Sequence, residues 1–169
     1  MEAMATMDKA VKVMTNREGK YLTFTLAEEE YGIGILKVKE IIGIMAITTV
    51  PRTPDYMKGV INLRGKVIPV VDLRLKFEME ALGYTERTCI IVVEITGDNQ
   101  KIQIGILVDS VSEVLNIKAA DIEDTPNFGS HLDTEYIWGM AKTGGRVKIL
   151  LDIDRILNSE EIATLEKAA

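Results

Sequence analysis

The chain contains one segment twice, with the two copies 80 residues apart. Residues 59–77, GVINLRGKVIPVVDLRLKF, align without a gap with residues 139–157, GMAKTGGRVKILLDIDRIL. The alignment places Gly59 on Gly139 and VVDL on LLDI. Two copies are fewer than the three or so repeats that an open solenoid needs. The repeat therefore favours a closed, compact fold that is built from two similar units.

A second pair of matching blocks lies upstream of the first. Residues 33–42, IGILKVKEII, resemble residues 104–115, IGILVDSVSEVL, if two extra residues follow the shared IGIL. Short apolar words often match by chance, but here two blocks match in the same order. We interpret the chain as an internal duplication.

Each copy contains a hairpin signal. Arg64-Gly65 and Gly144-Gly145 separate apolar runs and predict tight turns. In the first copy, Thr53 and Pro54 predict a short helix that Gly59 would end.

Pro69 lies inside the predicted return strand KVIPVVD. Proline has no N–H to donate to a neighbouring strand, so this position predicts an edge strand or a bulge.

About five short apolar runs with turn residues between them make up each copy, over 60 to 70 residues. This supports an all-β fold of two small barrels or curled sheets, because closing a sheet removes its edges. We place the first unit at about 20–85, with parts of the C-terminal region packing on it, and the second at about 86–158. A flexible segment, 1–19, would precede them, and a C-terminal helix, 159–167, would follow.

Charge and composition bound the class of partner. The chain has 169 residues, 47% of them hydrophobic, and a net charge of −6. Such a charge argues against a nucleic-acid surface over the whole molecule. Residues 36–77 carry eight basic and three acidic side chains, so this segment is +5 and the remainder is −11. The basic segment is either an ordinary solvated face or a surface for an acidic protein partner.

Signals for chemistry are few. One histidine, His131, and one cysteine, Cys89, do not make a set of metal ligands, and no nucleotide-binding or nucleophile motif is present. Asp72 and Asp152 occupy the same place in the two copies, which an N-cap for a short helix explains. We therefore expect no enzyme activity, no cofactor and no metal. A nucleic-acid binder and a small-molecule binder stay open as alternatives.

Apolar runs reach at most about seven residues, so we expect no direct membrane insertion, which requires about 20. Two exposed positions are candidates for protein contacts. Arg64 at its turn is either a fork for carboxylates or an ordinary polar turn residue. Phe128, in the loop TPNFG, either plugs the underlying core or anchors a partner, and the sequence alone favours the plug.

Four segments of the chain resemble a known family. YGIGILKVKEII, VPRTPDYMKGVINLRGKVIPVVDLR, GILVDSVSEV and YIWGMAK with ILLDIDRIL resemble the bacterial chemotaxis coupling proteins of the CheW family, from about Lys20 to the C-terminus. The resemblance implies two intertwined five-stranded SH3-like barrels. It also implies a non-enzymatic cytoplasmic adaptor that is recruited to membrane-associated receptor clusters. There the adaptor would link the cytoplasmic tips of chemoreceptors to the regulatory domain of the histidine kinase CheA.

The resemblance also implies binding residues. The receptor-contacting groove would include Val38, Glu40, Gly59, Arg64 and Gly139. Contacts with the kinase would involve Ile47 in the first unit and Phe128 in the second. For Phe128, the resemblance favours the anchor over the plug.

Overall fold

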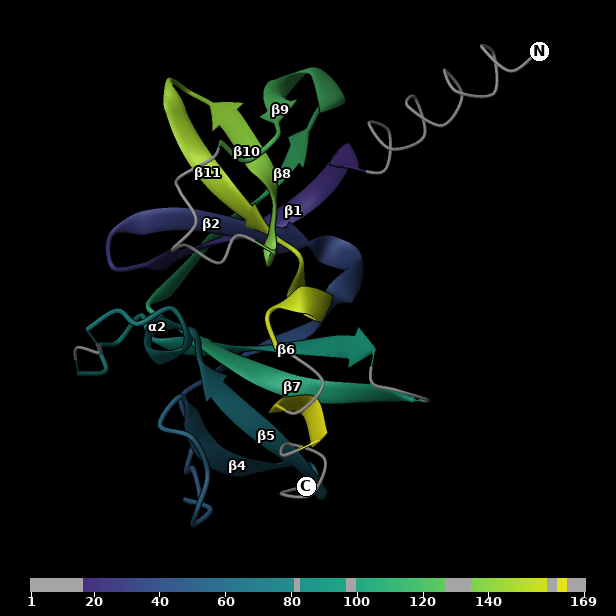
Figure 1. Ribbon diagram of the computed structural model, residues 1–169. Coiled ribbons are helices and arrows are strands. Elements are labelled where there is room, and N and C mark those ends of the chain that lie inside the picture. The colour runs from purple at the N-terminus through teal and green to yellow at the C-terminus, as the bar shows by residue number, and fades with distance from the viewer. Residues whose placement is uncertain (1–16, 81–82, 97–99, 127–134, 158–160, 164–169) are drawn as a thin grey trace.

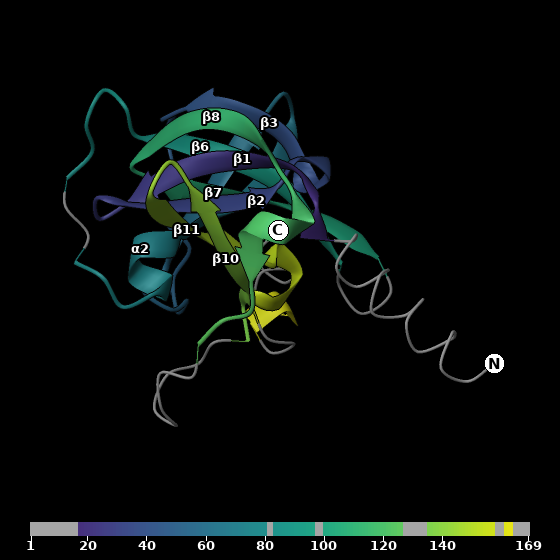
Figure 2. The ribbon, with the colours of Figure 1, turned by 90° about the horizontal axis from the view of Figure 1, so that it is seen from above.

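The protein consists of two small β-sheets with short helical turns between them (Figure 1). The computed structural model describes residues 17–80, 83–96, 100–126, 135–157 and 161–163. Seen from above, the six-stranded sheet lies in front of the five-stranded sheet (Figure 2). The predicted all-β class with two small units is confirmed, and the two sheets are compatible with SH3-like folds.

The six-stranded sheet has the order β8-β1-β2-β11-β10-β9. Its strands are β1 (Gly19–Leu26), β2 (Glu29–Gly34), β8 (Ser110–Ile117), β9 (Ile122–Glu123), β10 (Ile137–Thr143) and β11 (Arg146–Leu151). Neighbouring strands are antiparallel except β2 and β11, which are parallel. Because β9 has only two residues, the sheet is essentially five strands with a short addition.

The five-stranded sheet has the order β3-β6-β7-β5-β4. Its strands are β3 (Val38–Gly43), β4 (Met57–Leu63), β5 (Lys66–Asp72), β6 (Cys89–Thr96) and β7 (Lys101–Val108). The helical turns are η1 (Ile35–Lys37), α2 (Leu73–Lys76), η2 (Ala119–Asp121) and η3 (Ile153–Arg155). Here β5 and β7 form the parallel pair.

The two copies of the repeat exchange strands. Hairpin β1–β2 of the first copy pairs with β8 and β11 of the second, and hairpin β6–β7 of the second copy pairs with β3 and β5 of the first. Replacing every strand by its counterpart converts the order of one sheet into that of the other, apart from β9. The division that we expected near residue 85 therefore does not separate the two sheets, because each hairpin has its hydrogen-bonding partners in the other half of the chain.

The structure corrects the alignment of the upstream blocks. A Cβ on Gly32 would meet Leu150 at 3.0 Å, and a Cβ on Gly105 would meet Val70 at 3.5 Å. Val70 and Leu150 are counterparts, so Gly32 corresponds to Gly105, and residues 33–42 correspond to 106–115 without a gap. Matching the two IGIL words was wrong by two residues. A slip of two preserves the alternation of inward and outward side chains, so the pattern could not reveal it.

Both predicted tight turns are confirmed. Arg64 and Gly65 have φ of 53° and 86°, and Gly144 and Gly145 have φ of 56° and 76°. Positive φ at both central residues is the geometry of the two-residue turn that suits the twist of a hairpin. The turns connect β4 to β5 and β10 to β11.

The short helix expected after Thr53 is wrong. The Thr53 hydroxyl donates to the carbonyl of Val50 at 2.8 Å, and the N–H of Met57 donates to the carbonyl of Pro54 at 3.1 Å. These bonds close a turn, and β4 begins at Met57. Gly59 therefore lies inside a strand and does not end a helix.

The edge position expected from Pro69 is also wrong. β5 lies between β7 and β4, but its pairing with β7 begins only at Val70. Pro69 therefore needs no N–H on the β7 side. The alternative, a bulge, is present in the paired strand β4, between Met57 and Gly59.

The core has one large cluster and two smaller ones. The large cluster joins side chains of both sheets, such as Phe24 and Ile33 from one and Ile91 and Ile106 from the other. One small cluster forms around Ile61 in the five-stranded sheet, and the other lies in the six-stranded sheet. Because the large cluster contains side chains of both sheets, the two units share one central core.

Asp72 and Asp152 cap the turns that follow the repeated hairpins, as expected. Their carboxylates accept the N–H of Arg74 at 2.9 Å and of Asp154 at 3.1 Å. Residues 161–163 are helical, and the rest of the helix expected at 159–167 lies outside the described residues. The flexible segment expected at 1–19 lies mostly outside them too, while β1 already begins at Gly19.

Candidate functional site

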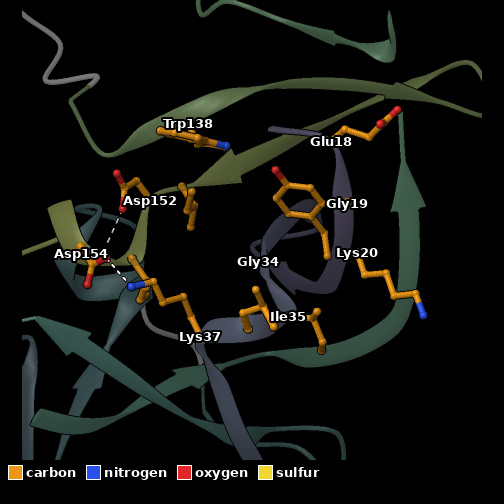
Figure 3. Close-up of a pocket in the computed structure, with 13 residues that line it drawn as sticks. Glu18, Gly19, Lys20, Gly34, Ile35, Lys37, Trp138, Asp152 and Asp154 are labelled. Carbon is orange, nitrogen blue, oxygen red and sulfur yellow. Dashed lines mark hydrogen bonds and ion pairs between the residues drawn. The ribbon is translucent and has the colours of Figure 1, made fainter. Parts of the chain in front are cut away.

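A pocket of about 380 Å³ lies between the two copies of the repeat (Figure 3). Residues 18–21 and 34–37 of the first copy form one side, and residues 138 and 151–154 of the second copy form the other. The pocket therefore opens where the end of β2 meets the end of β11, which are the parallel pair of the six-stranded sheet. Both copies are needed to build it.

Two large apolar side chains at this pocket are exposed. Leu36 in η1 is 91% exposed, and Trp138 in β10 is 37% exposed. Below them, Ile153 and Leu151 are buried, so the floor of the pocket is apolar. An apolar pocket with exposed Leu and Trp at its rim is typical of a surface that another protein covers.

Tyr21 fixes the inner wall of the pocket. Its hydroxyl donates to the backbone carbonyl of Arg17 at 2.5 Å. Burial raises the pKa of Tyr21, while a side-chain hydrogen bond with Trp138 opposes that rise. Tyr21 thus stays a neutral side chain that holds the indole of Trp138 in place.

Charged groups close the end of the pocket near η3. The ammonium of Lys37 lies 2.6 Å from Oδ2 of Asp154, and Oδ1 of Asp154 accepts the N–H of Thr96 at 3.0 Å. The ion pair joins the end of η1 to η3, and the hydrogen bond from Thr96 joins η3 to the end of β6. Together they tie the pocket to the five-stranded sheet.

The structure brings two of the expected receptor-contacting residues together. Arg64, at the tip of the β4–β5 hairpin, forms two hydrogen bonds with the carboxylate of Glu40 in β3, one of them with Nη1 3.2 Å from Oε2. The hydrogen bond lowers the pKa of Glu40 and raises that of Arg64. Since β3 and β4 are the two edges of the five-stranded sheet, the pair draws those edges together.

Val38 lies next to the pocket, because it directly follows Lys37. Its side chain is half-buried and packs against the large core cluster. Gly139 directly follows Trp138, on the opposite side of the pocket. Val38 and Gly139 are therefore sequence neighbours of lining residues, one in each copy, while neither is part of the pocket lining.

Gly59 and Gly139 have a steric reason to be glycine. A Cβ on Gly59 would lie 2.0 Å from the carbonyl oxygen of Thr48, and Gly59 has φ of +144°. A Cβ on Gly139 would lie 2.8 Å from Cγ2 of Ile122. Each glycine lets another segment pack closely on its hairpin, so these positions are required by the fold whether or not a partner touches them.

Of the two expected kinase-contacting residues, the structure describes only Ile47. Ile47 is half-buried and packs against the small cluster of the five-stranded sheet. Phe128 lies outside the described residues, so neither the plug nor the anchor is tested.

Sequence reasoning missed Leu36 and Trp138. Leu36 stands in an apolar run that predicts a buried strand, and only the turn η1 exposes it. Trp138 is the only tryptophan of the chain and precedes Gly139, a signal that could have been used.

Within the described residues, no helix is long and apolar enough to span a membrane.

Comparisons with known proteins agree with the geometry. The family of CheW-like domains matches residues 20–161. The chain is 43% identical to the chemotaxis protein CheW of Klebsiella aerogenes over 169 residues, which is 100% of this chain and 98% of the relative. It is 35% identical to the chemotaxis protein CheW of Rhizobium meliloti over 155 residues, 92% of this chain and 97% of the relative.

Among solved structures, the scaffolding protein CheW of Thermoanaerobacter tengcongensis superimposes with a TM-score of 0.75 and 38% identity. The match covers 85% of this chain and 97% of that chain. A scaffolding protein agrees with our expectation of a non-enzymatic function. The family match, the identity over the full chain and the shared fold show that this protein belongs to the CheW family of chemotaxis proteins.

Proposed function

We propose that the protein is an adaptor that couples chemoreceptors to the histidine kinase CheA. The observation that carries this proposal is the apolar pocket between the two copies, with Leu36 and Trp138 exposed at its rim. In this proposal the helical tip of a chemoreceptor covers the pocket. Val38 and Gly139 each follow a lining residue in the sequence, and Glu40, further along β3, pairs with Arg64 at the β4–β5 turn.

The kinase would bind elsewhere on the surface. Its regulatory domain would contact the segment around Ile47, and the loop that carries Phe128, as the family resemblance implies. Separate surfaces would let one adaptor hold a receptor and a kinase at once. Repeated weak contacts would then build an array, in which binding energy accumulates through effective concentration. The effect on kinase activity would come from unequal binding to its active and inactive arrangements.

This function implies a location. The chain would work in the cytoplasm and reach membrane-associated receptor clusters by binding receptor tips. Co-sedimentation with receptor-containing membranes, in the presence and absence of the kinase, tests that location directly.

Calorimetric titration of a receptor-tip fragment into the full chain tests the receptor surface. Leu36→Ser should weaken binding about tenfold, since burying a leucine side chain is worth about 1.5–3 kcal/mol. Val114→Ser is the matched control, because Val114 is an exposed apolar residue of β8 that does not line the pocket. Equal binding by the wild type and Leu36→Ser would place the receptor elsewhere.

A pull-down with the CheA regulatory domain tests the second surface. Phe128→Ala should weaken the capture of the kinase domain and leave the receptor fragment bound, while Arg64→Ala should do the reverse. If neither change weakens either interaction, the assignment of these residues is wrong.

A further inference from the structure

Asp72 and Asp152 are counterparts with the same backbone hydrogen bonds and different side-chain partners. The N–H of Asp72 donates to the carbonyl of Tyr56 at 2.7 Å, and the N–H of Asp152 donates to the carbonyl of Tyr136 at 2.8 Å. Each carboxylate also caps the turn that follows its hairpin. The backbone therefore presents both carboxylates in the same way.

The carboxylate of Asp72 is bound by the guanidinium of Arg74. Nε of Arg74 donates to Oδ1 at 3.1 Å, and Nη2 donates to Oδ2 at 3.0 Å. The side chains of Arg74 and Asp72 are 3% and 0% exposed. A guanidinium and a carboxylate in this two-point arrangement form one of the stronger polar contacts in proteins.

Among the residues that the structure describes, no guanidinium binds the carboxylate of Asp152 at two points. The counterpart of Arg74 is Asp154, whose oxygens are already engaged by Lys37 and by the N–H of Thr96. Oδ2 of Asp152 has Nε of Arg155 at 3.5 Å, which is beyond an ordinary hydrogen bond to a carboxylate. The side chain of Arg155 is 68% exposed.

The pocket lies at this place. Asp152 and Trp138 both line it, and Figure 3 draws both side chains among the lining residues. The lining also holds the acids Glu18 and Asp154 and the bases Lys20 and Lys37, so acids outnumber bases by one. An indole face and a carboxylate together suit a guanidinium, which stacks on aromatic rings and forks onto carboxylates. The apolar floor suits the methylene groups of a long side chain.

We propose that the pocket binds an arginine side chain of a protein partner, with its guanidinium on Asp152 and stacked against Trp138. The partner's arginine would thus place a guanidinium on Asp152, as Arg74 places one on Asp72. This proposal deepens the adaptor function, because it names the side chain that the docked partner places in the pocket. Its test uses a small probe, so it succeeds or fails separately from receptor binding.

Trp138 reports on the pocket directly, because it is the only tryptophan of the chain. N-acetyl-arginine methylamide is titrated into the full-length protein, and the indole N–H signal is followed by NMR. We expect a saturable shift at millimolar probe concentrations. N-acetyl-norvaline methylamide, which lacks the guanidinium, and N-acetyl-lysine methylamide should give clearly smaller shifts. No shift with the arginine probe, or equal shifts with the lysine or norvaline probe, would overturn the proposal.

Asp152→Asn tests the carboxylate. Asparagine caps helical turns as well as aspartate does, so the turn η3 should be kept while the charge is lost. We expect the affinity for the arginine probe to fall about tenfold, since a charged hydrogen bond is worth about 1.5–3 kcal/mol. Glu86→Gln, at an exposed acid outside the pocket lining, should bind the probe as the wild type does. An unchanged affinity in a folded Asp152→Asn protein would contradict the proposal, and the comparison of probes on the wild type decides the matter if the variant does not fold.

Discussion

Arg74 and Asp154 occupy the same position in the two repeated hairpins and carry opposite charges. Arg74 binds Asp109 with Nη1 3.0 Å from Oδ1, and Asp154 binds Lys37 at 2.6 Å. The charge at this repeated position is thus reversed between the two halves, and the charge of its partner is reversed with it. Both ion pairs lie where a repeated hairpin meets a strand end of the other sheet.

Each of these ion pairs also fixes a turn of the exchanged hairpin. The carboxylate of Asp109 accepts the N–H of Ala27, just after β1, at 2.8 Å. The carboxylate of Asp154 accepts the N–H of Thr96, at the end of β6, at 3.0 Å. In each half, a carboxylate of an ion pair therefore binds the turn of the exchanged hairpin. Asp109 does so next to the buried Arg74, and Asp154 does so beside the pocket.

Replacing Arg74 should destabilise the fold strongly. Arg74→Met leaves the fully buried carboxylate of Asp72 without its guanidinium, so we expect a loss of about 3–5 kcal/mol in the free energy of unfolding. Urea unfolding followed by circular dichroism measures it. Arg155→Met, at a largely exposed arginine, should change stability by no more than about 0.5 kcal/mol. A loss below about 1 kcal/mol in Arg74→Met would mean that the buried pair contributes little.

The pair of Arg64 and Glu40 should be visible in the titration of Glu40. Because the hydrogen bond from Arg64 holds the pKa of Glu40 down, Arg64→Gln should raise that pKa toward its ordinary value. A lowered folded-state pKa contributes stability above the unfolded pKa, and the contribution disappears as the pH falls through the folded pKa. Carboxyl carbon NMR over the acidic range measures the shift. The pKa of Glu94, which Lys39 lowers, should stay unchanged in this variant, and an unchanged Glu40 would contradict the prediction.

Gly59→Ala should cost stability, whatever it does to binding. The new Cβ would lie 2.0 Å from the Thr48 carbonyl oxygen and would sit at positive φ, so we expect a loss of about 3 kcal/mol. Gly43→Ala is the control, because a Cβ there has nothing within 4 Å, and it should change stability by less than about 1 kcal/mol. Thermal unfolding separates the two. Weakened receptor binding by Gly59→Ala at full stability would instead indicate direct contact.

Ile47→Ala tests the proposed kinase surface on the five-stranded sheet. We expect binding of the CheA regulatory domain to weaken about tenfold, as for an anchoring apolar residue, while binding of a receptor-tip fragment stays the same. Surface plasmon resonance with both partners measures this. Val114→Ala, in the six-stranded sheet, should bind the kinase domain as the wild type does. Loss of both partners together would point to unfolding of the segment and not to a contact.

Local sequence was sufficient for the hairpins and for the caps. Arg64-Gly65 and Gly144-Gly145 form the predicted turns, because positive φ at two successive residues depends on those residues alone. Asp72 caps its turn through a bond to a neighbour two residues away. The internal repeat followed from the same local similarity. Interactions of this kind need no knowledge of distant segments.

Local sequence could not predict the exposure of Leu36 or the surroundings of Asp152, because both depend on segments that are distant in the chain. An apolar run predicts burial for Leu36, and only the position of η1 at the edge of the pocket leaves it uncovered. Arg74 and Asp154 look alike in the sequence as polar residues after a hairpin. Their different surroundings arise because each faces a strand end from the other half of the chain.

The sequence by itself predicted the all-β class, the two tight turns of the repeated hairpins and the presence of two related units. Tertiary structure alone decided which hairpin joins which sheet. The counterpart strands have nearly the same pattern of inward and outward side chains, so pairing within a copy and pairing between copies are equivalent at the level of pattern. Packing of the shared central core selects the exchanged arrangement, and the pocket between the copies exists only as its consequence.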